Sequence, residues 1–337
     1  MLLEEALLNL LESSGYKTVD DPTGDPTLQD GPAGIKVKGR GGSHQIDAIA
    51  DFRVHQPFSH PQRLLVEAKC FEPRQVVGLP FVRGAVGTLK DVSEFWMTAG
   101  GQIPKQRYHY QYAMFSATGY TKDAQRYAFA HDVYLIPLAA SRFLSPVIQS
   151  IRNVTQRQPA EERNPNIPVQ MKELRREVRR AIRGVEAAPN IDEQFGELLA
   201  GVRRFVQACR QIRYALLAVL GARFPVFLVP SPDIRDERLR DEYDIRIFRG
   251  PQDRTWSLRE RDSGRELFSF DLPQELFLRY ADAGILTAGA ALDLKAEVMA
   301  SFQAMVVEDS RVRIITFRLD LPWLNQLREQ IGPRGLR

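Results

Sequence analysis

Acidic and basic side chains with the spacing of a catalytic site lie between residues 39 and 69. Asp47 follows the glycine-rich run GRGGSHQI (39–46) in an apolar, β-branched stretch, and Glu67-Ala68-Lys69 ends the next such stretch. Residues two apart in a strand share a face, so Glu67 and Lys69 point the same way, as do Gln45 and Asp47. If the two strands pair, Asp47, Glu67 and Lys69 converge. Carboxylate oxygens suit Mg²⁺, and a nearby lysine can orient water or stabilise charge on a phosphate.

An acidic-x-Lys triplet alone is weak evidence, because Glu and Lys are common residues. The chain also holds Asp293-Leu294-Lys295 and the related Gln170-Met171-Lys172. Both lie in helical patterns, where residues two apart do not face each other. Only Glu67-Ala68-Lys69 ends a hydrophobic strand that follows a strand with an aspartate. The alternative interpretation of this pattern is a charged strand edge with an ordinary ion pair.

The elements around these residues are expected to form an α/β fold. Leucines at helical spacing predict an amphipathic helix over Leu2–Ser13. The expected elements that follow are a loop over 20–34, a short strand over Ile35–Lys38, strands over Gln45–Val54 and Arg63–Lys69, a helix over Pro80–Met97, a strand over Tyr110–Ser116, a helix from Thr121 to about Ala130 and a strand over Val133–Pro137. This order predicts a mixed sheet flanked by helices.

The rest of the chain reads as two further parts, so the expected division is 1–145, 146–222 and 223–337. Residues 151–169 contain three prolines and three asparagines and predict a linker before a helical segment. Helices are expected over Met171–Val185, Ile191–Leu220 (as one helix or two), Pro273–Ala283, Ala291–Met305 and Pro322–Ile331. Strands are expected over Phe224–Pro230, Tyr243–Phe248, Thr255–Arg259, Glu266–Phe270 and Val312–Leu319. The last part is therefore expected to be a small α+β domain.

The order of the N-terminal features resembles the PD-(D/E)xK nuclease superfamily, and more narrowly its Mrr-like branch. The resemblance covers about residues 1–140. It rests on the first helix, the run Gly39–Gly42, Asp47, Glu67-Ala68-Lys69, the helix from Pro80, the segment Phe115–Ala124 and the strand Val133–Ile136. Ile46 stands where the superfamily's name has a proline. The resemblance implies a restriction-endonuclease-like sheet and Mg²⁺-dependent hydrolysis of DNA phosphodiester bonds.

The resemblance also implies roles for individual residues. Asp47 and Glu67 would hold Mg²⁺ with the backbone carbonyl of Ala68, Mn²⁺ would substitute for it, and Lys69 would position the attacking water. Contacts to phosphate or to these ligands are expected from Arg40, His44, Gln45, Arg83 and an acidic residue of the first helix, which is Glu5 or Glu4.

Several of these residues have a structural alternative. His44 can equally be a hydrogen-bonded residue that ends the glycine-rich turn, and Arg40 and Arg83 can equally be solvated surface arginines. Cys70 alternates away from Lys69 and is expected to be a small core residue. A basic run over 172–183 predicts either a solvated helix face or a helix that follows phosphates. Tyr108, Tyr110 and Tyr112 share a face and are expected to pack in the sheet rather than stack on bases.

Composition narrows the class of protein. The 337 residues are 44% hydrophobic, carry a net charge of +4 and include two cysteines. No apolar run approaches the ~18 residues of a membrane span. The N-terminus lacks the basic start of a signal peptide, and two cysteines are too few for a disulfide framework. A cytoplasmic location without a membrane partner is therefore expected. No GxxxxGK[ST] motif is present, so no ATP motor is expected.

The expected partners are DNA, a second copy of the chain that would cut the other strand, and a partner protein of a bacterial restriction or anti-phage defence system. The C-terminal part would then recognise DNA, a modification, a trigger or that partner. Two alternatives remain open: a non-cleaving nucleic-acid-binding or interaction protein on the same fold, and a structure-specific DNA repair nuclease.

Overall fold

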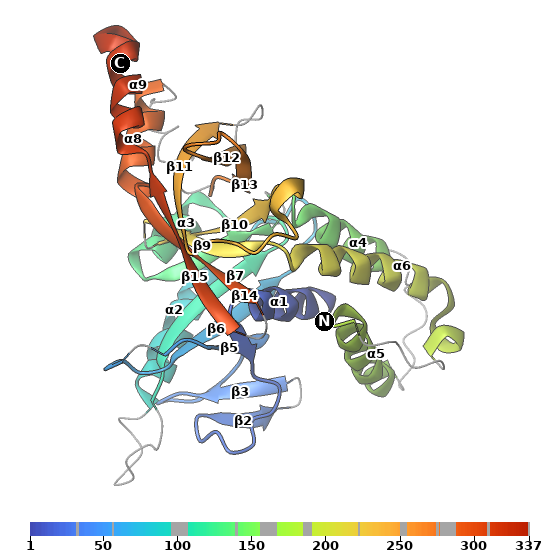
Figure 1. The fold of residues 1–337 in the computed structure, drawn as a ribbon. Helices are drawn as coiled ribbons and strands as arrows, with labels where there is room; N and C mark the ends of the chain where they lie inside the picture. The colour runs from blue at the N-terminus through green and yellow to red at the C-terminus, as the bar shows by residue number, and fades with distance from the viewer. Residues whose placement is uncertain are drawn as a thin grey trace. The chain divides into compact units, whose positions relative to one another are not determined.

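The chain forms two compact units in the computed structural model (Figure 1). Unit 1 comprises residues 1–12 and 16–213, and unit 2 comprises 13–15 and 214–337. The structure describes residues 1–31, 34–55, 57–95, 107–138, 141–155, 167–184, 191–221, 223–249, 255–273, 276, 288–308 and 311–335. The expected segment 146–222 is divided between the units, since its helices belong to unit 1 and its last strand belongs to unit 2.

A five-stranded mixed sheet forms the centre of unit 1, in the order β1-β5-β6-β7-β8. Its strands are β1 (Tyr16–Thr18), β5 (Ala48–Phe52), β6 (Gln62–Lys69), β7 (His109–Ser116) and β8 (Val133–Pro137). β5 is antiparallel to β1 and β6, whereas β6, β7 and β8 run parallel to one another. The expected α/β fold is confirmed, because helices flank this mixed sheet.

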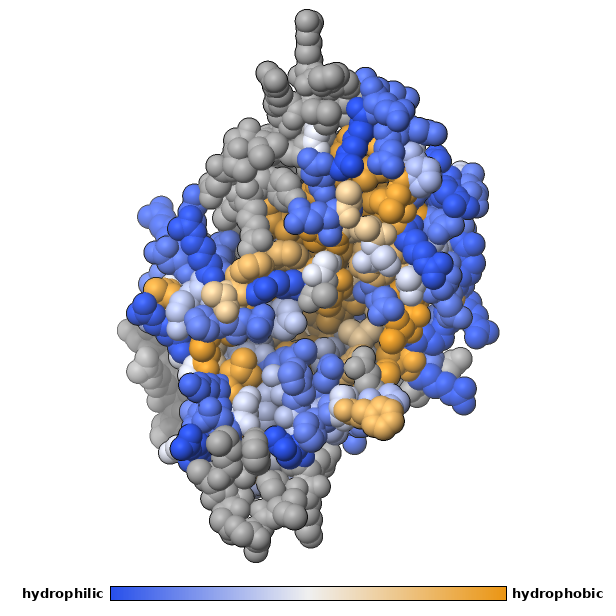
Figure 2. All heavy atoms as spheres, turned by 90° about the vertical axis from the view of Figure 1, so that its left-hand side faces the viewer, coloured by the Kyte–Doolittle hydropathy of each residue, from blue (hydrophilic) through white to orange (hydrophobic). Residues whose placement is uncertain are grey.

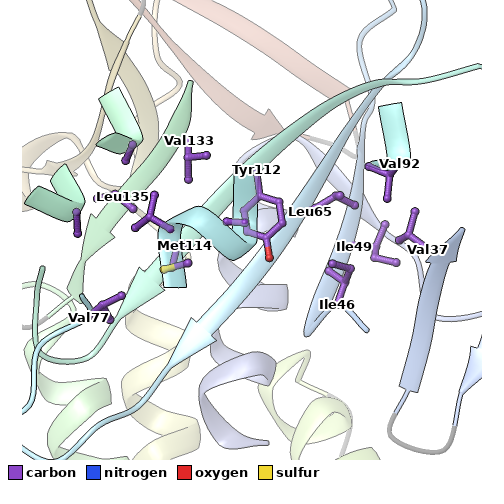
Figure 3. Close-up of a cluster of buried hydrophobic side chains, with 14 of the residues drawn as sticks. Val37, Ile46, Ile49, Leu65, Val77, Val92, Tyr112, Met114, Val133 and Leu135 are labelled. Atoms are coloured by element: carbon purple, nitrogen blue, oxygen red, sulfur yellow. The ribbon is translucent and has the colours of Figure 1, made fainter. Parts of the chain in front are cut away.

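The helices of this region are α1 (Leu2–Ser13), α2 (Leu79–Ser93) and α3 (Lys122–Ala130). Thr121 caps α3, since its hydroxyl accepts a hydrogen bond from the Ala124 N–H at 3.2 Å. One face of the sheet and the apolar sides of α2 and α3 form a single buried cluster (Figure 3). This cluster includes Ile49, Leu65, Tyr112, Met114, Val133 and Leu135 from the strands and Val82, Ala85, Val92, Ala124 and Ala128 from the helices.

Arg63 joins the start of β6 to the preceding loop. Its side chain is 1% exposed, and it pairs with Asp51 at 2.6 Å and with Asp25 at 2.8 Å. The guanidinium also lies 3.6 Å from the ring centroid of Tyr108. Every charge brought into this position therefore has a partner, which is the condition under which an arginine can be buried.

The expected strand Gln45–Val54 is wrong as a single element. β4 (Ser43–Gln45) belongs to a separate three-stranded antiparallel sheet with β2 (Leu28–Gly31) and β3 (Gly34–Lys38), and β5 starts anew at Ala48. The chain changes sheets at Ile46 and Asp47, so Gln45 and Asp47 do not share a strand face. β2 also forms within the expected loop 20–34.

Three more helices belong to unit 1: α4 (Ser145–Thr155), α5 (Ile167–Ile182) and α6 (Ile191–Ile212). The prediction of a linker over 151–169 is wrong at both ends, because α4 and α5 extend into it. The expected helix Ile191–Leu220 is too long, since its last residues form a strand. α2 ends at Ser93, and Met97, the expected end of this helix, lies outside the described residues.

Unit 2 is built on a closed barrel of seven strands, in the order β10-β13-β12-β11-β15-β14-β9. The strands are β9 (Leu216–Leu220), β10 (Phe224–Pro230), β11 (Glu242–Arg249), β12 (Thr255–Glu260), β13 (Glu266–Asp271), β14 (Ser301–Glu308) and β15 (Arg311–Leu319). A 3-10 turn, η3 (Pro232–Ile234), and the helices α8 (Ala288–Val298) and α9 (Leu321–Gly335) complete its described part. The expected helix Ala291–Met305 is therefore wrong beyond Val298, and most of the expected helix Pro273–Ala283 lies outside the described residues.

The surface is not uniformly polar. On the face drawn in Figure 2, hydrophobic residues (orange) interrupt the hydrophilic ones (blue). Large apolar side chains that are exposed within the described ranges are Phe58, Val76 and Phe81 in unit 1 and Ile314 and Leu321 in unit 2.

Candidate active site

The pairing of β5 with β6 brings Asp47 to the level of Glu67. Ala48, the first residue of β5, pairs with Val66, so Asp47 lies one residue further along, beside the end of β6. Asp47 Oδ2 accepts a hydrogen bond from the backbone N–H of Ala68 at 2.8 Å. The bend between the two sheets therefore aims the Asp47 carboxylate at the middle residue of the Glu-x-Lys triplet.

The surroundings of Asp47 disfavour its negative charge. Burial raises the pKa of the Asp47 carboxyl, and the charges of Glu4 and Glu67 raise it further. The Ala68 N–H and the Lys69 ammonium act in the opposite direction but do not compensate. Carboxylates gathered in this way repel one another, and a cation placed among them would relieve that repulsion.

Both oxygens of the Glu67 carboxylate are engaged. Oε1 pairs with Lys69 Nζ at 2.5 Å, and Oε2 accepts a hydrogen bond from the Tyr112 hydroxyl at 2.8 Å. The side chains of Glu67 and Lys69 are each 22% exposed, whereas Tyr112 on β7 is only 3% exposed. Glu67 and Lys69 thus share a face that solvent reaches, as expected, and a buried tyrosine supports the glutamate.

An aromatic side chain borders Lys69. Its ammonium lies 5.2 Å from the ring centroid of Phe81, in the first turn of α2. The Phe81 ring packs against Phe71 at 5.4 Å between centroids, yet 41% of Phe81 remains exposed. The lysine therefore has a carboxylate on one side and an apolar ring on the other, and this restricts the positions of its ammonium.

The structure distinguishes the two acidic residues of α1. Glu5 is buried and bound by Arg175 and Arg179 of α5, at 2.5 and 2.7 Å. Glu4 is partly exposed, pairs with Arg175 at 2.9 Å and contributes to the raised pKa of Asp47. Glu4 is therefore the acidic residue that influences the site. Of the two alternatives left open by the sequence, Glu5 is the one whose carboxylate is held by two arginines of α5, Arg175 and Arg179.

Three predicted contact residues serve the glycine-rich turn instead. His44 Nε2 lies 2.6 Å from Asp91 Oδ2 on α2, and the N–H of Gly41 donates to Asp91 Oδ1 at 2.8 Å. Arg40 pairs with Glu94 at 3.1 Å, beside the end of α2. Gln45 is exposed and donates to the Ile35 carbonyl of the neighbouring strand at 3.3 Å. These side chains attach the turn to α2 and the small sheet, so the structural alternative for His44 describes its contacts.

The structure also places three further residues named in the sequence analysis: Arg83, Ala68 and Cys70. Arg83 is exposed on α2, with its guanidinium 5.7 Å from the ring centroid of Tyr127 on α3. Ala68 lies between Glu67 and Lys69, as a carbonyl ligand would require, and its N–H also holds Asp47. Cys70 is exposed, so the expectation of a core residue is wrong: β6 ends at Lys69, and the strand alternation does not continue through Cys70.

The donor set fits Mg²⁺ by its chemistry. Mg²⁺ is commonly bound by one or two carboxylates and keeps several waters, which substrate phosphates can replace. Asp47 and Glu67 supply such carboxylates, and the raised pKa of Asp47 gives a cation an electrostatic role. Within the described ranges, no group of three or more His, Cys, Asp or Glu side chains is placed to hold a metal ion. Any bound ion would therefore need backbone, water or substrate oxygens.

The sequence interpretation missed residues that hold the site in place. Tyr112 was expected only as a packing residue, although the parallel pairing of β6 with β7 places it beside Glu67. No local sequence pattern indicated that Asp91 holds the glycine-rich turn, because its partner His44 lies 47 positions earlier in the chain. The basic run over 172–183 was expected to form either a solvated face or a phosphate-binding helix. Several of its arginines instead form ion pairs with α1: Arg175 and Arg179 bind Glu5, and Arg183 binds Glu12.

Comparison with known proteins assigns no family. No family model and no curated protein matches the chain. One solved structure is similar to part of the chain: the crystal structure of AF1548, a protein of unknown function. It shares 16% sequence identity with this chain at a TM-score of 0.36, and the match covers 63% of this chain and 97% of that one.

Among the residues that the structure describes, no helix is long and apolar enough to cross a membrane.

Proposed function

We propose that unit 1 is a Mg²⁺-dependent DNA endonuclease whose catalytic residues are Asp47, Glu67 and Lys69. The observation that carries the proposal is the convergence of these residues at the end of β6. Lys69 binds Glu67 at 2.5 Å, and Asp47 binds the backbone of the residue between them at 2.8 Å. The resemblance of residues 1–140 to Mrr-like nucleases supports DNA as the substrate.

Each residue of the site has a separate role in the proposed hydrolysis. Bound Mg²⁺ supplies Lewis-acid activation of water and phosphate. Asp47, Glu67 and the Ala68 carbonyl would hold the ion, and Mn²⁺ would substitute for it. The Ala68 N–H and the Tyr112 hydroxyl keep the two carboxylates in position. The Lys69 ammonium orients the attacking water and balances the charge that develops on the phosphate.

The biological setting follows from the resemblance alone. We infer a role in bacterial restriction or anti-phage defence, in the cytoplasm, with a homodimer cutting both strands. Unit 2 would recognise DNA, a modification, a trigger or a defence-system partner protein. Cleavage assays that compare linear duplex, modified duplex, forks and single strands separate this role from structure-specific repair.

Isothermal titration of Mg²⁺ and Mn²⁺ into the full chain tests the site directly. Asp47→Asn should abolish binding, whereas Asp30→Asn, a matched change at an exposed residue of β2, should leave it unchanged. Absence of binding by the wild type at millimolar metal would contradict the proposal and favour a non-cleaving nucleic-acid-binding protein.

The melting temperature of Asp47→Asn shows whether a loss of metal binding could result from misfolding of the variant. The folded chain holds the Asp47 proton more tightly than the unfolded chain, so ionising Asp47 costs stability as pH rises past its ordinary pKa. Asp47→Asn removes this cost and keeps an oxygen for the Ala68 N–H. At neutral pH and without metal, the variant should therefore melt at the wild-type temperature or above it.

A further inference from the structure

A lysine without a carboxylate partner is buried in unit 2. Lys295 lies on α8, is 7% exposed, and forms no ion pair or hydrogen bond with the residues that the structure describes. It is also the only lysine between residues 214 and 337, a range in which every other basic residue of the Lys/Arg type is arginine. Desolvation lowers its pKa to about 8.

Two tryptophans flank the Lys295 ammonium. Its Nζ lies 5.4 Å from the ring centroid of Trp256 on β12 and 5.5 Å from that of Trp323 on α9. Trp256 is 4% exposed, and its indole N–H is buried without a hydrogen-bond partner. The indole N–H of Trp256 is thus a fully buried donor without an acceptor in the described part of the unit, and the described residues give the neighbouring Lys295 ammonium only the two aromatic rings.

Among the residues that the structure describes, the neighbouring groups do not supply an acceptor for these donors. Asp320, an acidic residue beside Trp323, accepts a hydrogen bond from Arg246 at 2.9 Å and one from the Trp323 backbone N–H at 3.1 Å. Phe248 packs on Trp323 with ring centroids 5.2 Å apart and adds only apolar surface. The indole faces attract the ammonium through cation–π contacts, but they offer no lone pair to its N–H groups.

A buried donor without an acceptor, such as the Trp256 indole N–H, is rare in folded proteins, because it loses its bonds to water and gains none in return. The Lys295 ammonium beside it is largely withdrawn from water and has no anionic partner among the described residues. One ligand that brings anionic oxygens could accept from both the ammonium and the indole N–H.

We propose that Lys295 and Trp256 form a binding site in unit 2 for an oxygen anion, a phosphate or carboxylate group. The site is independent of the nuclease residues of unit 1. Lys295 supplies the charge and Trp256 supplies a directed N–H. The faces of Trp256 and Trp323 restrict the ammonium and provide an apolar border.

The test uses the full chain, with inorganic phosphate and acetate as separate probes and sodium chloride at matched ionic strength as the reference. Tryptophan fluorescence and melting temperature are both recorded. One of the two probes should give a saturable change that chloride does not give, and this identifies the preferred anion. Lys295→Met should weaken binding about tenfold or more, as expected for the loss of a charge-assisted bond.

Two further variants keep the result interpretable. Trp256→Phe keeps an aromatic side chain but removes the N–H together with part of the ring system; it should weaken binding, and the smaller ring should also lower the melting temperature by leaving a void in the core. Arg311→Met removes one positive charge from an exposed position of β15 and should bind like the wild type. Without ligand, Lys295→Met should melt above the wild type, because an unpaired buried charge is removed.

The proposal is overturned if Lys295→Met binds as tightly as the wild type. It is equally overturned if phosphate and acetate act only as chloride does, since Lys295 would then be a buried cation balanced by the indole rings alone. Neither outcome bears on metal binding at Asp47, so this proposal and the nuclease proposal fail separately.

Discussion

Removal of one hydroxyl tests whether a buried side chain positions the metal ligand Glu67. In Tyr112→Phe, the ring remains in the core but the 2.8 Å hydrogen bond to Glu67 Oε2 is lost. A hydrogen bond to a charged group contributes about 1.5–3 kcal/mol. Loss of a residue that orients a metal ligand typically weakens metal affinity about 10–100-fold, or about 1.4–2.7 kcal/mol. The two magnitudes agree, so we expect a Kd for Mn²⁺ that is higher by about that factor.

Tyr110 provides the matched control on the same strand. Its hydroxyl is buried and, among the residues that the structure describes, has no hydrogen-bond partner. Tyr110→Phe removes the same atom from the same sheet and should leave both Mn²⁺ affinity and stability near the wild-type values. Titration calorimetry of the three proteins measures the effect. Equal affinities for Tyr112→Phe and the wild type would refute the reasoning, because Glu67 would then need no support or would not bind the ion.

Three further perturbations test other contacts. Arg63→Met leaves Asp25 and Asp51 without their cation and should lower the free energy of unfolding by about 3 kcal/mol; a urea midpoint equal to that of the wild type would contradict the buried ion pairs. His44→Ala should cost roughly 1 kcal/mol through loss of the partly exposed bond to Asp91 and leave Mn²⁺ affinity unchanged; a large loss of affinity would instead place His44 in the site. Iodoacetamide should alkylate Cys70 but not buried Cys209 in the native protein. Although Cys70 as a residue is exposed, its thiol is partly desolvated by neighbouring atoms, and this raises its pKa; the rate should therefore still be rising at pH 9, and a plateau below pH 8 would contradict this.

The central pairing of the site was predictable from local sequence. Two short apolar stretches rich in β-branched residues predict β5 and β6, and the period of two places Glu67 and Lys69 on one face. The parallel strand β7 and the helices α2 and α3 follow from equally local patterns. Each of these inferences depends on residues only a few positions apart, which is why sequence patterns carry them.

Other features depend on contacts between distant residues. The change of sheet at Ile46 arises because β4 pairs with β3 whereas β5 pairs with β6. The run Leu216–Leu220 has good helix formers, but pairing with β10 and β14 makes it a strand. Glu5 is neutralised by arginines about 170 positions later. No local pattern specifies such partners, because tertiary packing decides them.

Metal-dependent DNA cleavage by the purified full chain tests the central proposal most directly. Supercoiled plasmid is incubated with the wild type, Lys69→Met and Lys17→Met, the last being a matched change at an exposed lysine of β1. The proposal predicts nicking or linearisation that requires Mg²⁺ or Mn²⁺, stops with EDTA, persists in Lys17→Met and falls about 10²–10³-fold in Lys69→Met. Cleavage that is equal in Lys69→Met and the wild type, or that proceeds in EDTA, would contradict the assignment of Asp47, Glu67 and Lys69.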